Sequence, residues 1–354
     1  MSIAEERYFA REAIEAHRFG ASAALAEQAV HCLELVAELA DSGLKFQFKG
    51  GNSLLLILQT PRRFSIDVDI ATDETRESIE QCLDTIVKKH GVFMQWTHRK
   101  HKTKPWIPLA SYHLYFRSHF VGPEEAFIML DAQLRRSPYK TTMKAVACGE
   151  IYACDILAEL PLPASIIGDK LLTLGPNTLG IPAGKGKEAQ RLKHVFDVST
   201  LVDTDPDLDD IRASFNACMK HENEIQEKDI GVAQVLDDTL EMCVCVSRSA
   251  VKPQACAETE PVLREHITGL EQFAGHLFVR KYTWQDLQRD TARAAACMTA
   301  VCTPSVTGLE LGRALCEARH IMVGSVAPRH GLACTDEALF LWNRVSAWRG
   351  EDCK

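Results

Sequence analysis

The sequence predicts an α+β fold in which a mixed β-sheet flanked by helices is followed by a C-terminal helical bundle. Strand-like alternation of polar and apolar residues recurs between residues 45 and 154. Apolar residues three and four apart, the spacing of an amphipathic helix, dominate the chain after about residue 208. The acidic sequence DTDPDLDD is typical of a linker, so we expect one domain over residues 1–203 and a helical domain over residues 204–354.

Composition is that of an ordinary soluble protein, with 354 residues, 46% hydrophobic and 25% charged. No apolar run approaches the ~20 residues of a transmembrane helix, and the N-terminus is charged and amphipathic rather than signal-like. We therefore expect a cytoplasmic protein whose thirteen cysteines are mainly reduced, buried thiols. The net charge of −8 argues against a general nucleic-acid coat, although residues 1–203 are nearly balanced, with 24 basic and 25 acidic residues.

The individual elements follow from periodicity and from turn residues. Helices are predicted over 4–18, 21–42, about 75–90, 164–174 and 188–202. Strands are predicted over Val92–Arg99, Ser111–His119, Ala126–Arg135 and Ala145–Cys154. The C-terminal helices are expected near 211–228, 231–248, 261–280, 284–302, 307–323 and 335–348.

The stretch from Lys45 to Ile70 predicts a strand, a glycine turn, a short helix over Leu54–Gln59 and a second strand. Gly50 and Gly51 allow backbone dihedrals that side chains would forbid. Asn52 or Ser53 can cap the helix, whose free N–H groups and dipole favour an anion. This turn is therefore a candidate phosphate cradle.

The second strand of this stretch places Ser65, Asp67 and Asp69 on one face and three apolar residues on the other. Two carboxylates on one face, about 7 Å apart at the backbone, repel each other, and one would take up a proton unless a cation lies between them. Mg²⁺ binds through one or two carboxylates and usually brings substrate phosphates with it. The alternative is a buried strand with two solvated aspartates after an ordinary Gly-Gly turn.

Taken together, GGNS followed by IDVDI resembles the signature of the nucleotidyltransferase superfamily. The longer form, KGGNSL then RFSIDVDI, resembles the AbiEii/AbiGii abortive-infection toxins, the nucleotidyltransferases of type IV toxin–antitoxin systems. The resemblance implies a nucleotidyltransferase-like catalytic domain over 1–203, an NTP substrate, Mg²⁺ and an antitoxin partner. It also implies a growth-arresting toxin that adds nucleotides to the 3′ end of tRNA.

The same resemblance extends the set of candidate site residues. Superfamily members often use a third carboxylate from a neighbouring strand, for which Asp131 is the candidate; pairing with Arg135 or with a turn amide is the alternative. The match over 164–202 adds Lys170 and Asp197 to the candidate site residues, and the side chain of Lys170 is expected to reach outward. His194 departs from the family pattern. The resemblance is specific over about residues 45–75 and 164–202, weak between these ranges and absent beyond residue 205.

Each candidate residue has an expected role. Asp67 and Asp69, with Asp131, would hold Mg²⁺. Lys170 suits the charge of the triphosphate, and Asp197 would orient Lys170 or the nucleotide; their alternatives are an exposed lysine and a surface ion pair. The phosphate cradle would consist of Gly50, Gly51 and Ser53, with a hydroxyl contact from Ser65.

Several alternatives remain for the molecule that accepts the nucleotide. The basic, aromatic sequence from Arg99 to Trp106 could grip a nucleic-acid backbone and stack a base, or it could be a solvated hairpin tip. A nucleotidyltransferase that modifies a small molecule or a protein would share the same first motif. A non-catalytic nucleotide-binding scaffold is the third alternative.

Overall fold

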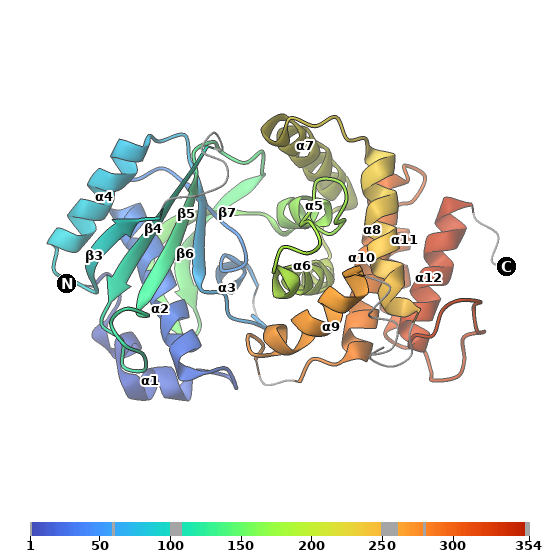
Figure 1. Cartoon of the computed structure of the whole chain (residues 1–354), viewed down its shortest axis with the longest axis horizontal. Helices are drawn as coiled ribbons and strands as arrows, with labels where there is room; N and C mark the ends of the chain where they lie inside the picture. Colours follow the sequence, from blue (N-terminus) through green and yellow to red (C-terminus); the bar gives the residue numbers. More distant parts are fainter. Residues whose placement is uncertain (1, 59–60, 100–107, 249–260, 279–280, 351–354) are drawn as a thin grey trace. The chain divides into compact units, whose positions relative to one another are not determined.

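A computed structural model of the chain describes residues 2–58, 61–99, 108–248, 261–278 and 281–350. The described strands form a mixed seven-stranded sheet of order β3-β4-β5-β2-β1-β7-β6 (Figure 1). β2 pairs with β5 and β1 pairs with β7 in parallel, and the other neighbours are antiparallel. The strands are β1 (Gln47–Lys49), β2 (Asp67–Ala71), β3 (Phe93–His98), β4 (Leu109–Phe116), β5 (Phe127–Gln133), β6 (Thr141–Cys148) and β7 (Tyr152–Pro161).

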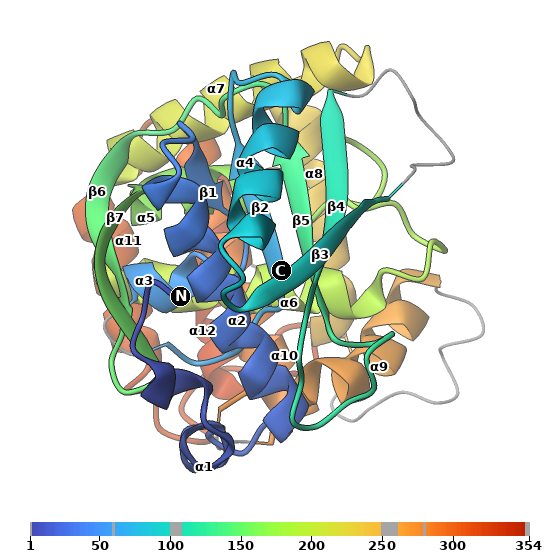
Figure 2. The same cartoon turned by 90° about the vertical axis from the view of Figure 1, so that its left-hand side faces the viewer.

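Helices α2 (Ala23–Asp41) and α4 (Arg76–Lys88) cover the same face of this sheet (Figures 1 and 2). Apolar residues alternate along the central strands, and those that face the helices, such as Val68, Ile70 and Leu130, are fully buried. The polar residues of the same strands therefore point to the opposite face. The remaining elements of this part are η1 (Glu6–Phe9), α1 (Arg11–Ala16) and the one-turn α3 (Leu54–Ile57).

The chain divides into two compact units, and the first contains residues 1–162 with 275–280. The second unit is helical and contains residues 163–274 and 281–354. Its helices are α5 (Pro163–Leu172), α6 (Glu188–Leu201), η2 (Val202–Thr204), α7 (Leu208–Gln226), α8 (Val232–Ser247), α9 (Pro261–Ala274), α10 (Trp284–Cys302), α11 (Gly308–Ala318) and α12 (Asp336–Arg349). The predicted fold class, a mixed sheet with flanking helices followed by a helical bundle, is confirmed.

The structural boundary at residues 162/163 differs from the predicted domain boundary at 203/204. Helix α5 packs extensively on α7, and Gly168 lies so close to the backbone at Phe215 that a Cβ at position 168 would clash. Asp207, in the predicted linker, instead caps α7 by accepting hydrogen bonds from the amides of Asp209 and Asp210. The assignment of residues 1–203 as the catalytic domain remains a prediction.

The predicted strand over Ala145–Cys154 is wrong, because the chain reverses in its middle. Gly149 adopts φ +52° and joins β6 to β7 in an antiparallel hairpin. The second arm then continues to Pro161, where Glu159 pairs with Gln47 of β1. The hairpin thus forms one end of the sheet beside the glycine turn that follows β1.

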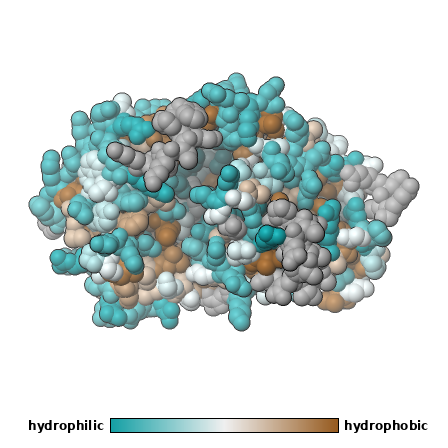
Figure 3. All heavy atoms as spheres, viewed as in Figure 1, coloured by the Kyte–Doolittle hydropathy of each residue, from teal (hydrophilic) through white to brown (hydrophobic). Residues whose placement is uncertain are grey.

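Among the described residues, no helix is both long and apolar enough to cross a bilayer. The face drawn in Figure 3 is mainly hydrophilic, with hydrophobic residues in small, scattered groups.

Candidate active site

Asp67 and Asp69 lie on one face of β2, opposite the buried helix-facing side. Val68 and Ile70, which alternate with them, are fully buried, whereas both aspartates are partly exposed. Their separation of two residues sets their Cα atoms about 7 Å apart. The shared face expected from the alternation is therefore present, and it offers two hard oxygen donors side by side.

Asp131 lies beside this pair on the neighbouring strand. In the parallel register of β2 and β5, Asp69 is the direct partner of Asp131, so both carboxylates point to the same face. One oxygen of Asp131 accepts a short hydrogen bond from the hydroxyl of Ser111 on β4. Within the described part of the chain, no three acidic, histidine or cysteine side chains are arranged to hold one metal ion. Asp131 as a third ligand therefore stays a prediction.

The glycine turn after β1 is built against these acids. Gly50 adopts φ +74°, and a Cβ there would overlap the carboxylate of Asp69. A Cβ on Gly51 would meet the guanidinium of Arg63 and lie 3.1 Å from Oγ of Ser65. The turn thus brings backbone amides, the hydroxyl of Ser65, the guanidinium of Arg63 and the carboxylate of Asp69 into one small region. This set of groups suits a divalent cation and phosphates.

The hydroxyl of Ser53 makes a different contact in this turn from the predicted helix cap. Its hydroxyl does not cap α3 but donates a 2.8 Å hydrogen bond to the carbonyl oxygen of Gly50, and the side chain is fully buried. This bond fixes the curvature of the turn. A phosphate contact from Ser53 would therefore come from its backbone N–H rather than from the hydroxyl proton.

Replacing Gly50 with alanine should destabilise the protein by about 2–4 kcal/mol, because it adds positive-φ strain to a clash with Asp69. Gly149 provides the matched control, since it also has positive φ but a Cβ there would meet nothing within 4 Å. Its alanine variant should lose only about 1–2 kcal/mol in the same urea titration. Equal losses would show that Gly50 does not approach Asp69 closely.

Arg63 is a site residue to which the sequence reasoning gave no role. It is 4% exposed, and one guanidinium nitrogen donates to the carbonyl oxygen of Phe64 at 3.2 Å, while another faces Gly51. The Arg-Phe-Ser part of the family pattern was the signal that could have identified it. Its fixed positive charge beside the glycine turn favours an anionic group there.

A distant segment of the chain fixes the position of Arg63. Residues 275–278 belong to the first unit, and Leu277 forms an antiparallel bridge with Arg63 in the segment before β2. The amide of Phe64 donates to the carbonyl of His276 at 2.8 Å, and the amide of Phe278 donates to the carbonyl of Arg62 at 2.9 Å. The rings of Phe64 and Phe278 also pack, with centroids 4.4 Å apart. These contacts fix the position of the segment from Arg62 to Phe64, which leads into β2.

Helix α2 supports the same segment from the core. The thiol of Cys32 donates to the carbonyl of Ile66 at 3.1 Å. Complete burial raises the pKa of this thiol well above its usual value, and the charge of Asp67 raises it further. Cys32 therefore stays a neutral thiol, as expected of the buried cysteines.

Lys170 and Asp197 lie in the helical unit, on α5 and α6. They form an ion pair of 2.8 Å, with side chains only 6% and 1% exposed. The expectation that Lys170 reaches outward is wrong, because its ammonium group is buried against Asp197. Both alternatives, an exposed lysine and a surface pair, are likewise excluded. The predicted orientation of Lys170 by Asp197 agrees with this geometry, and any contact with a nucleotide remains a prediction.

The basic sequence Arg99–Trp106 lies outside the described residues except for Arg99 itself. Arg99 follows β3, and its guanidinium approaches the sulfur of Met129 on β5. A role of this sequence in RNA binding therefore stays a prediction.

Comparison with known proteins adds to this geometry. The profile described as nucleotidyl transferase AbiEii toxin, type IV toxin–antitoxin system, matches residues 34–270, a wider range than the motifs alone indicated. Among solved structures, the chain is similar to MenT4, a nucleotidyltransferase toxin from Mycobacterium tuberculosis H37Rv. That match has 16% sequence identity and a TM-score of 0.48, and it covers 81% of this chain and 94% of MenT4. No curated protein matches the sequence.

Proposed function

This chain belongs to the AbiEii family of nucleotidyltransferase toxins of type IV toxin–antitoxin systems, and we propose that it transfers a nucleoside monophosphate from an NTP to an RNA hydroxyl in a Mg²⁺-dependent reaction. Nucleotidyl transfer as its activity follows from the family. The observation that carries the finer proposal is the placement of Asp67 and Asp69 on one strand face, against the Gly50–Gly51 turn. By resemblance to the family, the acceptor is the 3′ end of tRNA and an antitoxin protein is the natural partner.

In this proposal the chain mainly positions the substrates and neutralises the charge of the phosphates, and it takes little part in covalent chemistry itself, as is typical of phosphoryl transfer. Asp67 and Asp69, with Asp131 beside them, would hold Mg²⁺, which supplies charge neutralisation at the phosphates and favours an ionised acceptor hydroxyl. Gly50 and Gly51 leave the backbone open to the triphosphate, and Ser65 adds a hydroxyl there. Lys170, held by Asp197, would offset the charge of the departing pyrophosphate.

Arg63 should contribute to NTP binding through its charge. Replacing it with glutamine is expected to lower kcat/KM for the NTP by about 10–100-fold, the loss of one charge-assisted hydrogen bond, with most of the change in KM. The adjacent, exposed Arg62 provides the control, and its glutamine variant should stay within about twofold of the parent. Equal effects of the two substitutions in steady-state kinetics would exclude a specific role for Arg63.

The test of the proposed function is a labelling experiment with the full-length chain. Each of the four α-³²P-labelled NTPs is incubated with the protein, Mg²⁺ and either total RNA, purified tRNA, a protein extract or small hydroxylated acceptors. Label at tRNA 3′ ends is the expected result. Label on polypeptide or on a small molecule instead would replace the RNA acceptor, and failure to bind Mg·NTP in calorimetry would favour the scaffold alternative.

A further inference from the structure

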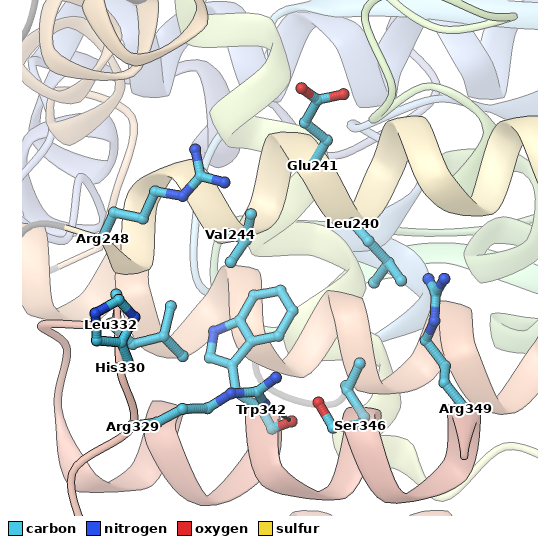
Figure 4. Close-up of a pocket in the computed structure, with 12 residues that line it drawn as sticks. Leu240, Glu241, Val244, Arg248, Arg329, His330, Leu332, Trp342, Ser346 and Arg349 are labelled. Atoms are coloured by element: carbon cyan, nitrogen blue, oxygen red, sulfur yellow. Dashed lines mark hydrogen bonds between the residues drawn. The ribbon is translucent and has the colours of Figure 1, made fainter. Parts of the chain in front are cut away.

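The helical unit contains a hollow of about 490 Å³, bounded by α8, α12 and the segment 329–332 (Figure 4). Its charged groups do not converge on one point, because Arg248 and Arg349 stand at opposite ends of it and Trp342 is buried. Polar side chains that do converge lie in the first unit, on the polar face of the sheet, around the ammonium group of Lys49.

Lys49 lies on the same face of the sheet as the two candidate metal ligands. Phe48 is fully buried in the core, so the alternation of β1 turns Gln47 and Lys49 to the opposite, polar face. In the antiparallel register of β1 and β2, Lys49 is the direct partner of Asp69, and residues directly opposite each other share a face. Lys49 is partly exposed, so a ligand on this face can reach it.

The side chain of Lys49 reaches across β2 to the next strand. Its Nζ donates to Oε1 of Gln133 on β5 at 3.0 Å and to Oγ of Ser137 at 3.2 Å. Since β2 lies between β1 and β5 and Ala71 is the partner of Gln133, this contact spans β2 at Ala71. Ala71 follows Asp69 by two residues, which sets their Cα atoms about 7 Å apart. The ammonium group therefore lies next to the acids.

Neutral groups hold this cation in place. The ring of Tyr139 lies 5.5 Å from Nζ, within the range of a cation–π contact. The amide of Ser137 donates to Oε1 of Gln47 at 2.9 Å, which fixes the hydroxyl that Lys49 contacts. Within the described residues, Lys49 forms no ion pair with a carboxylate, and two neutral acceptors use two of its three N–H donors. Lys49 can therefore donate to an anionic oxygen.

The position of Lys49 relative to the glycine turn indicates which anion this is. A Cβ on Gly51 would lie beside Ser65, so the turn borders the acids at the Ser65 end of the row that Ser65, Asp67, Asp69 and Ala71 form. The ammonium group borders the other end, at Ala71. Phosphoryl transfer places the attacking and leaving oxygens roughly in line. If pyrophosphate leaves toward the turn, the acceptor hydroxyl approaches from the side of Lys49.

We propose that Lys49 binds the acceptor, with its ammonium group donating to the last phosphodiester before the 3′ end of the RNA. Gln133 and Ser137 are positioning residues that hold the ammonium group at this point. The assignment rests on the proposed function, because it requires an RNA acceptor. The triphosphate of the NTP offers the same phosphate chemistry, and the experiment distinguishes the two.

The experiment measures steady-state transfer by the full-length chain to two forms of tRNA, one natural and one with a neutral methylphosphonate in place of the last phosphodiester. With the parent protein, the neutral linkage should raise KM for the tRNA at least about tenfold, the loss of one charge-assisted hydrogen bond. Lys49→Gln should raise KM for the natural tRNA by a similar factor. The neutral linkage should then cost this variant less than about twofold, because both changes remove the same contact. KM for the NTP should stay within about twofold.

A control and a second variant separate this contact from effects on overall charge and folding. Lys88 is exposed on α4, which covers the opposite face of the sheet, and Lys88→Gln removes the same charge. This control should keep the parental KM values and the full penalty for the neutral linkage. Gln133→Glu keeps Lys49 but places a carboxylate of similar size against its ammonium group. It should raise KM for the natural tRNA about tenfold and remove the penalty, and it provides the test if Lys49→Gln does not fold.

Several outcomes would overturn the assignment. If the neutral linkage costs the parent nothing, or costs Lys49→Gln as much as it costs the parent, Lys49 does not bind that phosphate. A rise in KM for the NTP alone would assign Lys49 to the triphosphate instead. Either result with a parent that labels tRNA refutes the role of Lys49 alone, whereas a parent that labels no RNA refutes the proposed function and the acceptor role with it.

Discussion

Replacing Asp67 with asparagine should lower nucleotide transfer by at least about 10³-fold, equivalent to about 4 kcal/mol of transition-state stabilisation. The substitution keeps the size of the side chain but removes one of the two charges on the polar face of β2. In the proposed site, the remaining acid, Asp69, would then hold a divalent cation too weakly to neutralise a triphosphate. Incorporation of α-³²P-labelled nucleotide gives the rate, and calorimetry should show the loss of Mg²⁺-dependent NTP binding.

The control for Asp67→Asn is a second acid in the same sheet. Asp155 is exposed on β7, away from the glycine turn, and its asparagine variant should retain the parental rate. EDTA should abolish transfer by the parent protein, and added Mg²⁺ should restore it. Undiminished labelling by Asp67→Asn would show that the proposed metal site is wrong, whatever the family of the chain.

The placement of Asp67 and Asp69 was predictable from sequence because it depends only on strand periodicity. Alternation with Val68 and Ile70 fixes which face each carboxylate takes, and no distant contact is needed to decide it. The same reasoning predicted the C-terminal helices, whose apolar spacing is local information. Local periodicity of this kind explains why the helices, most of the strands and the placement of Asp67 and Asp69 could be predicted.

Features that depend on distant packing were not predictable in this way. The hydroxyl partner of Asp131 is Ser111, which meets it only because β4 and β5 pair in one particular register. Arg63 is fixed by a segment more than 200 residues further along the chain. The hairpin at Gly149 was missed because the apolar pattern continues through the turn. The boundary at residue 162 follows from packing of α5 on α7, which the acidic sequence near 203 does not reveal.

The buried pair of Lys170 and Asp197 should produce the second large effect, on stability and on transfer together. Lys170→Met removes the cation that is paired with the buried carboxylate of Asp197 on α6, so we expect a loss of about 3–5 kcal/mol in the free energy of unfolding. Nucleotide transfer should fall by at least about 10²-fold as well, because the cation proposed to offset the charge of the triphosphate is lost. Urea unfolding and the labelling assay measure the two losses separately.

A double variant separates the two roles of this pair. Lys170→Met with Asp197→Leu replaces both buried charges with apolar groups of similar size, which is often neutral or stabilising. Stability should therefore return close to that of the parent, whereas transfer should stay at the level of the single variant. Recovery of transfer along with stability would show that the pair has only a structural role.

The helical unit supplies a matched control for that double variant. Arg191 on α6 and Glu265 on α9 form another buried ion pair, with side chains 1% and 9% exposed, and no catalytic role is proposed for either. Arg191→Met with Glu265→Leu should leave the transfer rate of the folded protein within about twofold of the parent. Because both double variants remove one buried charge pair that involves α6, a loss of transfer confined to the Lys170–Asp197 variant must come from the chemistry of that pair and not from the packing of the helices.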